Sequence, residues 1–331
     1  MSLVSPEQID LLIRLEGIFM PYARKQRDDA HKNLPDGVGA RFVHYTSASN
    51  LISILGKKRL WMRNTNCMDD FREVSHGYDI LHAYFADNGR RDAFIAAFDM
   101  CAPGAATEAI GHFNGWFPDI RNNTYISSVS EHLEREDLHG RLSMWRAFGN
   151  SPARVAFVFR VPKFSGAALA MNLNFSPVAY LTEAEIMNNI SEVMLNVQND
   201  TEFLKRFDRQ IIVNYIFTML LLAVTCLKHE GFREEREWRV FYSPGQRPSP
   251  LIESTSEVVG GVPQIVYQIP LDKTVSPDIA ELDIAAVFDR LIIGPTQYPI
   301  AMIEAFTKAL TAAGVVDARS KIFPSLIPIR T

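Results

Sequence analysis

Two carboxylates stand two residues apart in the segment 230–242, where a charged run gives way to an apolar one. Because side chains alternate along an extended chain, Glu235 and Glu237 are expected on one face of a strand that spans 237–242. Such a pair suits a cationic transition state, since one carboxylate can stabilise positive charge while the other takes a proton. The alternative is an edge strand whose charges are solvated or paired with neighbouring arginines.

A second set of candidate residues, His44-Tyr45-Thr46, lies at an expected strand-to-helix junction. The unpaired N–H groups at a helix N-terminus favour an anion such as a diphosphate. His44 is expected near the end of the strand, from which its side chain can reach a cleft. The alternative is a core histidine beside an ordinary helix cap.

An acidic group formed by Asp69, Asp70 and Glu73 surrounds an expected helix start. These carboxylates could bind a divalent cation or a ribose, but an N-cap followed by a capping box accounts for them equally well. The histidines are not spaced as metal ligands, and HExxH is absent. We therefore predict no metal site.

Two further motifs have the residue types of a nucleotide site. Ser128 and Ser130 lie on an expected strand and could supply hydroxyls, whereas Trp145 and Arg146 pair a stacking ring with a guanidinium. The alternatives are an exposed strand edge and a core tryptophan covered by its arginine. No P-loop, GxGxxG or GxSxG pattern is present, so the sequence does not indicate a nucleophile triad.

Composition limits the class of protein. The chain has 331 residues, 47% hydrophobic and 22% charged, which is a globular balance with enough apolar material for a sizeable core. Its net charge of −4 argues against a surface built throughout to coat nucleic acid. Three widely spaced cysteines without CxxC predict reduced, buried thiols: Cys67, Cys101 and Cys226.

The longest apolar run, residues 211–227, contains polar side chains and reaches only the lower limit for a membrane span. A buried core helix is the better interpretation. The N-terminal stretch has a helix-start pattern and lacks a signal-peptide pattern. We therefore expect a cytoplasmic protein without a membrane partner.

The hydrophobic pattern predicts an α+β fold, with strands towards both ends of the chain and helices between them. We expect an N-terminal helical segment at 1–40 and one α+β domain at 41–331, with a helical insertion at about 182–229 that contains two helices. Expected strands include 41–45, 59–63, 124–130, 154–161, 237–242, 264–270 and 289–293. The segment 244–263 is the most loop-like stretch and is expected to be an insertion or flap.

In combination, these motifs resemble a bacterial family catalogued as a domain of unknown function. The resemblance runs from about residue 41 to 296 and rests on His44-Tyr45-Thr46, Leu60-Trp61, Met68-Asp69-Asp70 with Glu73, Ser127–Ser130, Met144-Trp145-Arg146, Glu235-x-Glu237-Trp238-Arg239 and Ile292-Ile293-Gly294-Pro295. Two positions depart from the family pattern. Asp69-Asp70-Phe71 replaces Asn-Asp-Pro, and Phe148 replaces a tyrosine, which removes any hydroxyl role there.

More distantly, the pattern is similar to ADP-ribosyltransferases, which implies a mixed, mostly antiparallel split sheet and NAD as a substrate. By this resemblance, His44 would hold the adenosine ribose and Ser128 or Ser130 the nicotinamide ribose. Glu237 would stabilise the oxocarbenium-like state, and Glu235 would orient or deprotonate the acceptor. The other implied contacts are stacking by Trp61 or Tyr45, a diphosphate site at Arg41 or Arg146, and further NAD-site contacts from Thr46, Trp145 and Arg239, with Asp70 and Glu73 as substrate contacts.

The sequence therefore predicts an NAD-dependent ADP-ribosyltransferase or NAD glycohydrolase, of the kind found among toxins and phage-defence effectors. Its acceptor would be nucleic acid or protein, and an antitoxin or a second copy of the chain would be its partner. Two alternatives stay open. One is a metal-dependent nuclease or phosphodiesterase, and the other is a non-catalytic nucleotide-binding sensor domain.

Overall fold

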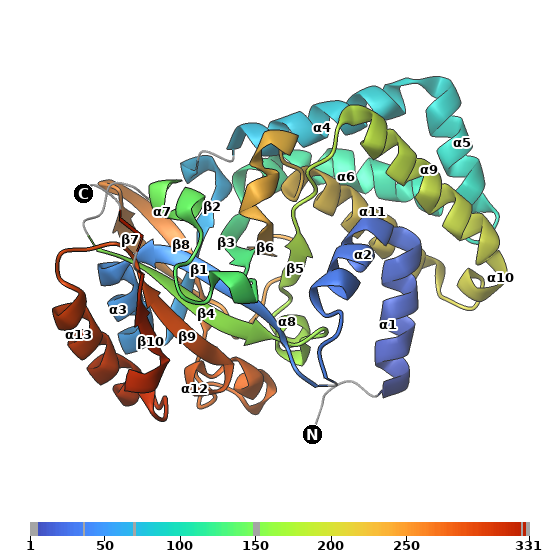
Figure 1. Cartoon of the computed structure of the whole chain (residues 1–331). Helices are drawn as coiled ribbons and strands as arrows, with labels where there is room; N and C mark the ends of the chain where they lie inside the picture. Colours follow the sequence, from blue (N-terminus) through green and yellow to red (C-terminus); the bar gives the residue numbers. More distant parts are fainter. Residues whose placement is uncertain (1–5, 36, 69–70, 148–152, 326, 329–331) are drawn as a thin grey trace.

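The structure of the protein, a computed structural model, describes residues 6–35, 37–68, 71–147, 153–325 and 327–328. Its strands form a mixed, mostly antiparallel sheet, which confirms the predicted α+β class. Figure 1 shows this sheet in one half of the molecule and a set of long helices in the other half, with the N-terminal helix pair beside those helices.

The sheet has the order β10-β9-β4-β1-β3-β2-β8-β7, and β6 pairs with both β3 and β5. Only the pair β9 and β10 is parallel. The strands of the described residues are β1 (Ala40–Ser47), β2 (Arg59–Asn64), β3 (Tyr125–Glu131), β4 (Arg154–Val161), β5 (Asn174–Pro177), β6 (Glu237–Tyr242), β7 (Glu253–Val259), β8 (Val262–Pro270), β9 (Phe288–Ile293) and β10 (Ile322–Pro324).

Strand β3 is the branch point of the sheet. Along one edge it pairs with β6 over six consecutive residues. Along its other edge it pairs with β1 near its end, at Ser130 and Glu131, and with β2 near its start, at Tyr125 and Ile126. Residues 127–129 have no strand partner on that second edge. The sheet therefore splits between β1 and β2, and backbone groups of β3 at the split need other partners.

Two groups of helices cover the sheet. One group surrounds a core cluster that includes Ile126 and Phe241, and the other packs on a cluster that includes Phe157 and Leu291. The first group comprises α1 (Pro6–Phe19), α4 (Phe71–Ala86), α5 (Asn88–Asp99), α6 (Ala105–Asn122), α9 (Glu183–Asn199), α10 (Thr201–Leu204) and α11 (Arg209–Thr225). Helix α2 (Pro21–Ala30) follows α1, and its Ala30 packs on a smaller cluster that includes Phe42 and Trp238. The second comprises α3 (Ala48–Lys57), α8 (Gly166–Ala170), α12 (Ile284–Val287) and α13 (Pro299–Ala312).

The strand register assigns side chains to the two faces of the sheet. Val43 lies opposite Ser130, which in turn lies opposite Glu237, so these three side chains share what we call the first face. His44 is the next residue along β1 and points to the second face. His44 and Glu237 therefore lie on opposite faces of the sheet, although the resemblance to ADP-ribosyltransferases implies that both contact one NAD molecule.

Several element predictions hold and others need correction. Residues 211–227 largely coincide with α11, a core helix, and no helix in the described ranges is long and apolar enough to span a bilayer. The predicted flap at 244–263 contains β7, an edge strand in a hairpin with β8. The insertion at 182–229 has three helices instead of two. Strand β7 escaped detection because its polar, exposed residues carry no hydrophobic alternation.

Trp145 is held between two glycines that belong to other segments. It lies on α7 (Leu142–Ala147), is 1% exposed, and packs edge-on against Tyr45 with ring centroids 4.9 Å apart. A Cβ at Gly140 would lie 2.7 Å from the indole ring, and one at Gly294 would lie 2.9 Å from it. Close packing thus explains why the Met-Trp-Arg and Ile-Ile-Gly-Pro motifs occur together in this chain.

We predict that Gly140→Ala lowers the free energy of unfolding by about 2–4 kcal/mol, because the new Cβ meets Trp145 and the backbone φ is +66°. Gly111→Ala is the matched control, since Gly111 is exposed in the middle of α6 with nothing near its Cβ position. It should stabilise the protein by about 0.5–1 kcal/mol. Urea unfolding measures both, and equal effects of the two variants would contradict this packing argument.

Candidate functional site

The strongest polar site on the first face surrounds Glu237, which is 5% exposed. Its Oε1 accepts hydrogen bonds from the Ser128 hydroxyl at 2.5 Å and from Arg239 Nε at 2.9 Å. Its Oε2 accepts from Lys228 and from Arg239 Nη2, each at 3.3 Å. Lys228 also donates to Glu235 at 2.9 Å. We call these five residues the Glu237 cluster.

Charge compensation keeps Glu237 ionised. Burial alone would raise the pKa of this carboxyl group, yet the positive charges of Arg239 and Lys228, together with hydrogen bonds from Arg239 and Ser128, hold its pKa below the ordinary value. Arg239 is 1% exposed and also donates to the carbonyl of Thr225 at 2.7 Å. Both carboxylate oxygens therefore already have two donors each.

The turn before β6 changes the expected position of Glu235. Residues Glu230–Glu235 form the 3₁₀ helix η3, and Arg236 ends it in the left-handed region with φ of 44°. Strand β6 begins only at Glu237. The two carboxylates thus do not leave one strand face, as the alternation had predicted. Lys228, which follows α11, brings them together instead.

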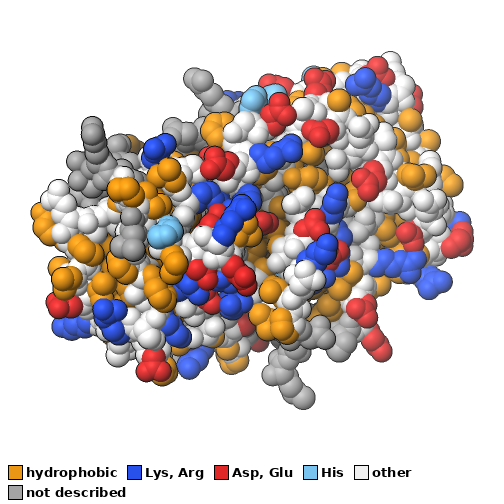
Figure 2. Space-filling view, viewed as in Figure 1, with side chains coloured by type: hydrophobic (Ala, Val, Ile, Leu, Met, Phe, Trp, Pro, Cys, Tyr) orange, Lys and Arg blue, Asp and Glu red, His pale blue; other side chains and the backbone are white. Residues whose placement is uncertain are grey.

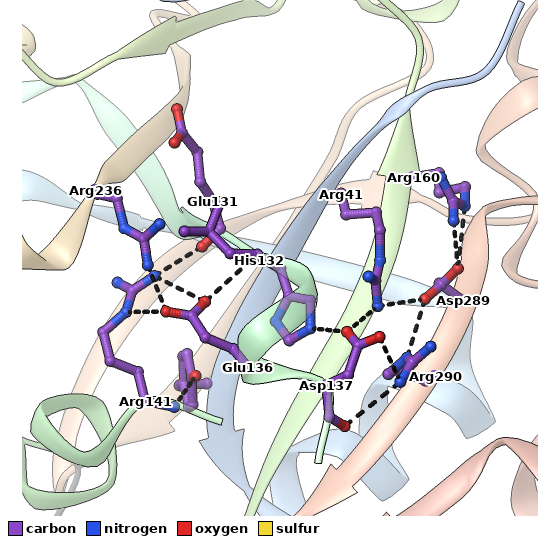
Figure 3. Close-up of polar contacts among 12 residues, drawn as sticks. Arg41, Glu131, His132, Glu136, Asp137, Arg141, Arg160, Arg236, Asp289 and Arg290 are labelled. Carbon is purple, nitrogen blue, oxygen red and sulfur yellow. Dashed lines mark hydrogen bonds and ion pairs between the residues drawn. The ribbon is translucent and has the colours of Figure 1, made fainter. Parts of the chain in front are cut away.

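Figure 3 shows a second polar network, which we call the arginine–carboxylate network. Arg41 forms ion pairs with Asp137 at 2.6 Å and with Asp289 at 2.9 Å. Arg160 and Arg290 complete the shell around these two carboxylates. Burial would raise the pKa of Asp137 and of Asp289, but the neighbouring arginines hold both below the ordinary value. Arg41, predicted to bind a diphosphate, is therefore committed to two internal carboxylates.

The other part of the network connects the sheet to the turn before β6. Arg141 is 6% exposed and pairs with Glu136, which also pairs with Arg236. The guanidinium of Arg141 donates to the carbonyls of Glu234 and Glu235 at 2.9 and 2.7 Å. The hydroxyl of Tyr45 accepts from the Arg141 N–H at 2.8 Å. These bonds fix the segment that leads into Glu237.

His44 lies at the split in the sheet. Its Nδ1 is 3.1 Å from the carbonyl of Ser128, and because a carbonyl only accepts, Nδ1 carries the proton. Burial lowers the pKa of His44 more than this bond raises it, so the ring is neutral at pH 7. Nε2 is then a hydrogen-bond acceptor, and within the described part of the chain it makes no hydrogen bond.

The side chain of His44 lines an apolar pocket on the second face, which we call the His44 pocket. The pocket encloses about 870 Å³ counted out to its mouth. Its walls come from the strands at the split, from β5, and from α3 and α8. Representative lining residues are Val129, Phe157, Phe175, Val240 and Ala168.

The other residues predicted to contact NAD lie in several different parts of the fold. Tyr45 and Trp145 are buried against each other, and burial raises the pKa of Tyr45 to about 12, so neither ring is free to stack on a base. Ser130 is 2% exposed beside Glu237. Thr46 is also buried and accepts from the Asn50 side chain, while Ser47, not Thr46, caps α3.

Four other predicted contacts lie away from the Glu237 cluster or outside the described residues. Trp61 is half-buried on β2, with the Lys57 ammonium 5.6 Å from its ring centroid. Arg146 is exposed on α7. Asp70 and the side chain of Glu73 lie outside the described residues. Among the residues that are described, no three His, Cys, Asp or Glu side chains are arranged to hold a metal ion. Cys226 is buried as expected, but Cys67 is exposed.

Sequence reasoning missed Lys228, which pairs with the predicted carboxylates Glu235 and Glu237. It also missed five members of the arginine–carboxylate network: Glu136, Asp137, Arg141, Asp289 and Arg290. The position of Lys228 in the sequence indicated its role. Lys228 and Arg233 are the two basic residues, Lys or Arg, between the end of the apolar run and Glu235. The other five come from segments without a motif and meet only through the sheet.

On the face drawn in Figure 2, acidic and basic side chains are interspersed, without a broad field of either sign.

Comparison with known proteins adds one finding. A family model described as a protein of unknown function (DUF2971) matches residues 144–240, which is less than a third of the chain. This stretch runs from α7 to β6 and includes Trp145, Lys228, Glu235, Glu237 and Arg239. No curated protein and no solved structure matches the chain significantly.

We predict that Glu237→Gln lowers the free energy of unfolding at pH 7 by about 3 kcal/mol, because it removes the buried negative charge that faces Arg239 and Lys228. Glu235→Gln is the control, since this more exposed carboxylate has one ion pair and should lose less than about 1 kcal/mol. Chemical denaturation of both variants and the native chain measures the difference.

The same variant has a pH signature. The pKa of Glu237 is lowered in the folded protein from an ordinary value of 4.5. Its contribution to stability is therefore present above pH 4.5 and is lost as the pH falls further through the folded-state pKa. The stability gap between the native chain and Glu237→Gln should narrow below pH 4.5. A gap that stays constant from pH 7 to pH 3 would mean that Glu237 is not held ionised.

Proposed function

We propose that this chain is a ligand-binding domain of the sensor kind, and that its ligand is a small uncharged molecule held in the His44 pocket. The observation that carries the proposal is the free acceptor of His44. Nδ1 is engaged by Ser128, the ring is neutral, and Nε2 is left to bond a donor on a ligand.

The pocket walls favour an uncharged ligand. Apart from His44, the lining is almost wholly aliphatic or aromatic, and within the described chain it contains no Lys or Arg. A phosphate would therefore be buried there without a counter-charge, at a high desolvation cost. An apolar body with one O–H or N–H group fits these walls.

The arrangement around Glu237 supports binding over catalysis at the motif carboxylates. A carboxylate that stabilises an oxocarbenium-like state must present an oxygen to the reacting carbon. Both oxygens of Glu237 are occupied by cluster donors, and the residue is buried. Ser128 joins this cluster to the pocket, since its carbonyl accepts from His44 and its hydroxyl donates to Glu237. A sensor can use such a shared residue to report occupancy.

The expected outcome with model probes is that 4-propylphenol binds about fivefold to tenfold more tightly than propylbenzene, because only the phenol donates a hydrogen bond to Nε2. Isothermal titration calorimetry measures both affinities. The ratio should change less between pH 8 and pH 6 than it would for a histidine with an ordinary pKa, because burial lowers the pKa of His44.

Two variants control this measurement. His44→Phe removes the acceptor and should bring the two probes to equal affinity, while Ala168→Phe fills the pocket and should abolish both. Circular dichroism checks that each variant is folded. Equal binding of the two probes to the native chain, or binding that survives Ala168→Phe, would place the ligand elsewhere.

A second candidate, NAD-dependent glycosyl transfer at Glu237, has one observation in its favour. The Ser128 hydroxyl donates to Glu237, and this contact joins the Ser-rich strand to the Glu-x-Glu segment, as the ADP-ribosyltransferase resemblance implies. In this reading, a substrate would have to displace Lys228 from the carboxylate. The acceptor of the ADP-ribosyl group would be nucleic acid or protein, with water as the acceptor in glycohydrolysis.

The expected result for this candidate is nicotinamide release from NAD, with a loss of at least about 100-fold in Glu237→Gln. Release is measured by chromatography with the purified chain, alone and with added DNA, RNA or cell lysate. Glu235→Gln, which leaves the donors to Glu237 in place, serves as a matched variant. If no addition produces release by the native chain, glycosyl transfer at Glu237 is refuted.

A further inference from the structure

A second cavity lies in the helical half of the molecule, away from the His44 pocket. It encloses about 890 Å³ counted out to its mouth. Its walls come from the junction of α1 and α2, from α4, from the chain after β5, and from α9 and α11 of the insertion. In Figure 1, the helix pair α1 and α2 lies beside α9 and α11. We call this space the helical cavity.

The helical cavity is more uniformly apolar than an ordinary small-molecule site. Its inner wall consists of core residues such as Phe19, Phe94 and Leu220, each at most 1% exposed. No ionisable Asp, Glu, Lys, Arg or His side chain lines it within the described chain. A charged group of an occupant would therefore be buried there without a counter-charge. The polar lining residues include Tyr22, Ser176 and Asn189, and the rest of the wall suits a part that is mainly hydrocarbon.

Small side chains create the space. Ala179 and Ala223 lie on two different walls, where larger residues would close the gap. Gly77 also lines the cavity, but it serves packing, because a Cβ there would lie 2.9 Å from the carbonyl of Ala223. Protein interiors are otherwise close-packed, and empty apolar volume is destabilising. An apolar occupant would recover the dispersion contacts that these walls lack.

We propose that the helical cavity is a second binding site, and that its ligand carries an aliphatic chain. The walls supply a continuous hydrocarbon surface from several helices, which suits a flexible chain better than a rigid ring with polar substituents. The polar end of the ligand lies at the mouth, in contact with water. This site is separate from the His44 pocket, since the two share no lining residue.

The test is a homologous series of n-alkan-1-ols, from hexan-1-ol to decan-1-ol, that competes with N-phenyl-1-naphthylamine for the purified full chain. Affinity should rise about fourfold for each added methylene as more of the chain is buried. Ala223→Phe and the milder Ala179→Leu fill the cavity from two walls and should each weaken decan-1-ol binding at least tenfold. Ala168→Phe, which fills the His44 pocket, should leave it unchanged.

Several results would overturn the proposal. The fluorescent probe could fail to bind saturably, or the alkanol affinity could be independent of chain length. Decan-1-ol binding could also be lost in Ala168→Phe and kept in the two variants that fill the helical cavity. Circular dichroism and thermal melting identify a variant that fails to fold. If Ala223→Phe fails to fold, the decan-1-ol affinity of Ala179→Leu still tests the proposal. Because the phenol probe reports on the His44 pocket and the alkanol series on the helical cavity, each proposal can fail without the other.

Discussion

The backbone carbonyl of Ser128 lies where the sheet splits, and a side chain supplies the hydrogen bond that no strand offers. His44 fills this role, which fixes its tautomer, and its side chain lines the His44 pocket. The hydroxyl of the same serine donates to Glu237 on the other side of the sheet. Ser128 thus contacts both the Glu237 cluster and a residue that lines the His44 pocket, so the position of β3 determines where each site can form.

Burial of Glu237 imposes the second constraint. A lone buried carboxylate would take up a proton, whereas Arg239 and Lys228 supply enough positive charge to keep this one ionised. Lys228 comes from the end of the helical insertion, and Arg239 also donates to Thr225 at the C-terminal end of α11. The cluster therefore joins the insertion to the sheet. A buried carboxylate whose charge is neutralised in this way is better suited to hold two parts of the structure together than to act as an exposed catalytic group.

Hydrophobic patterning was sufficient to predict most strands and helices, including β1, β3, β6 and the core helix α11, because each buries an apolar face. It was not sufficient to predict which residues meet. The face on which His44 lies depends on a register set by pairing with β3, and the turn at Arg236 removes Glu235 from the strand. Strand β7 was missed for the opposite reason, since its pairing is made by backbone groups of polar residues.

The two proposed sites border the same polar cluster from different sides. Ser128 touches His44 on one side, and Cys226 and Leu227, which line the helical cavity, immediately precede Lys228. Ala179 pairs with this segment through a bridge to Leu227, so the cavity wall and the backbone that positions Lys228 are the same piece of chain. Coupling between sites requires an element with two arrangements that both can bias. Lys228 bonds both Glu235 and Glu237, so a ligand that moved its segment would change how the ammonium group is shared between the two carboxylates.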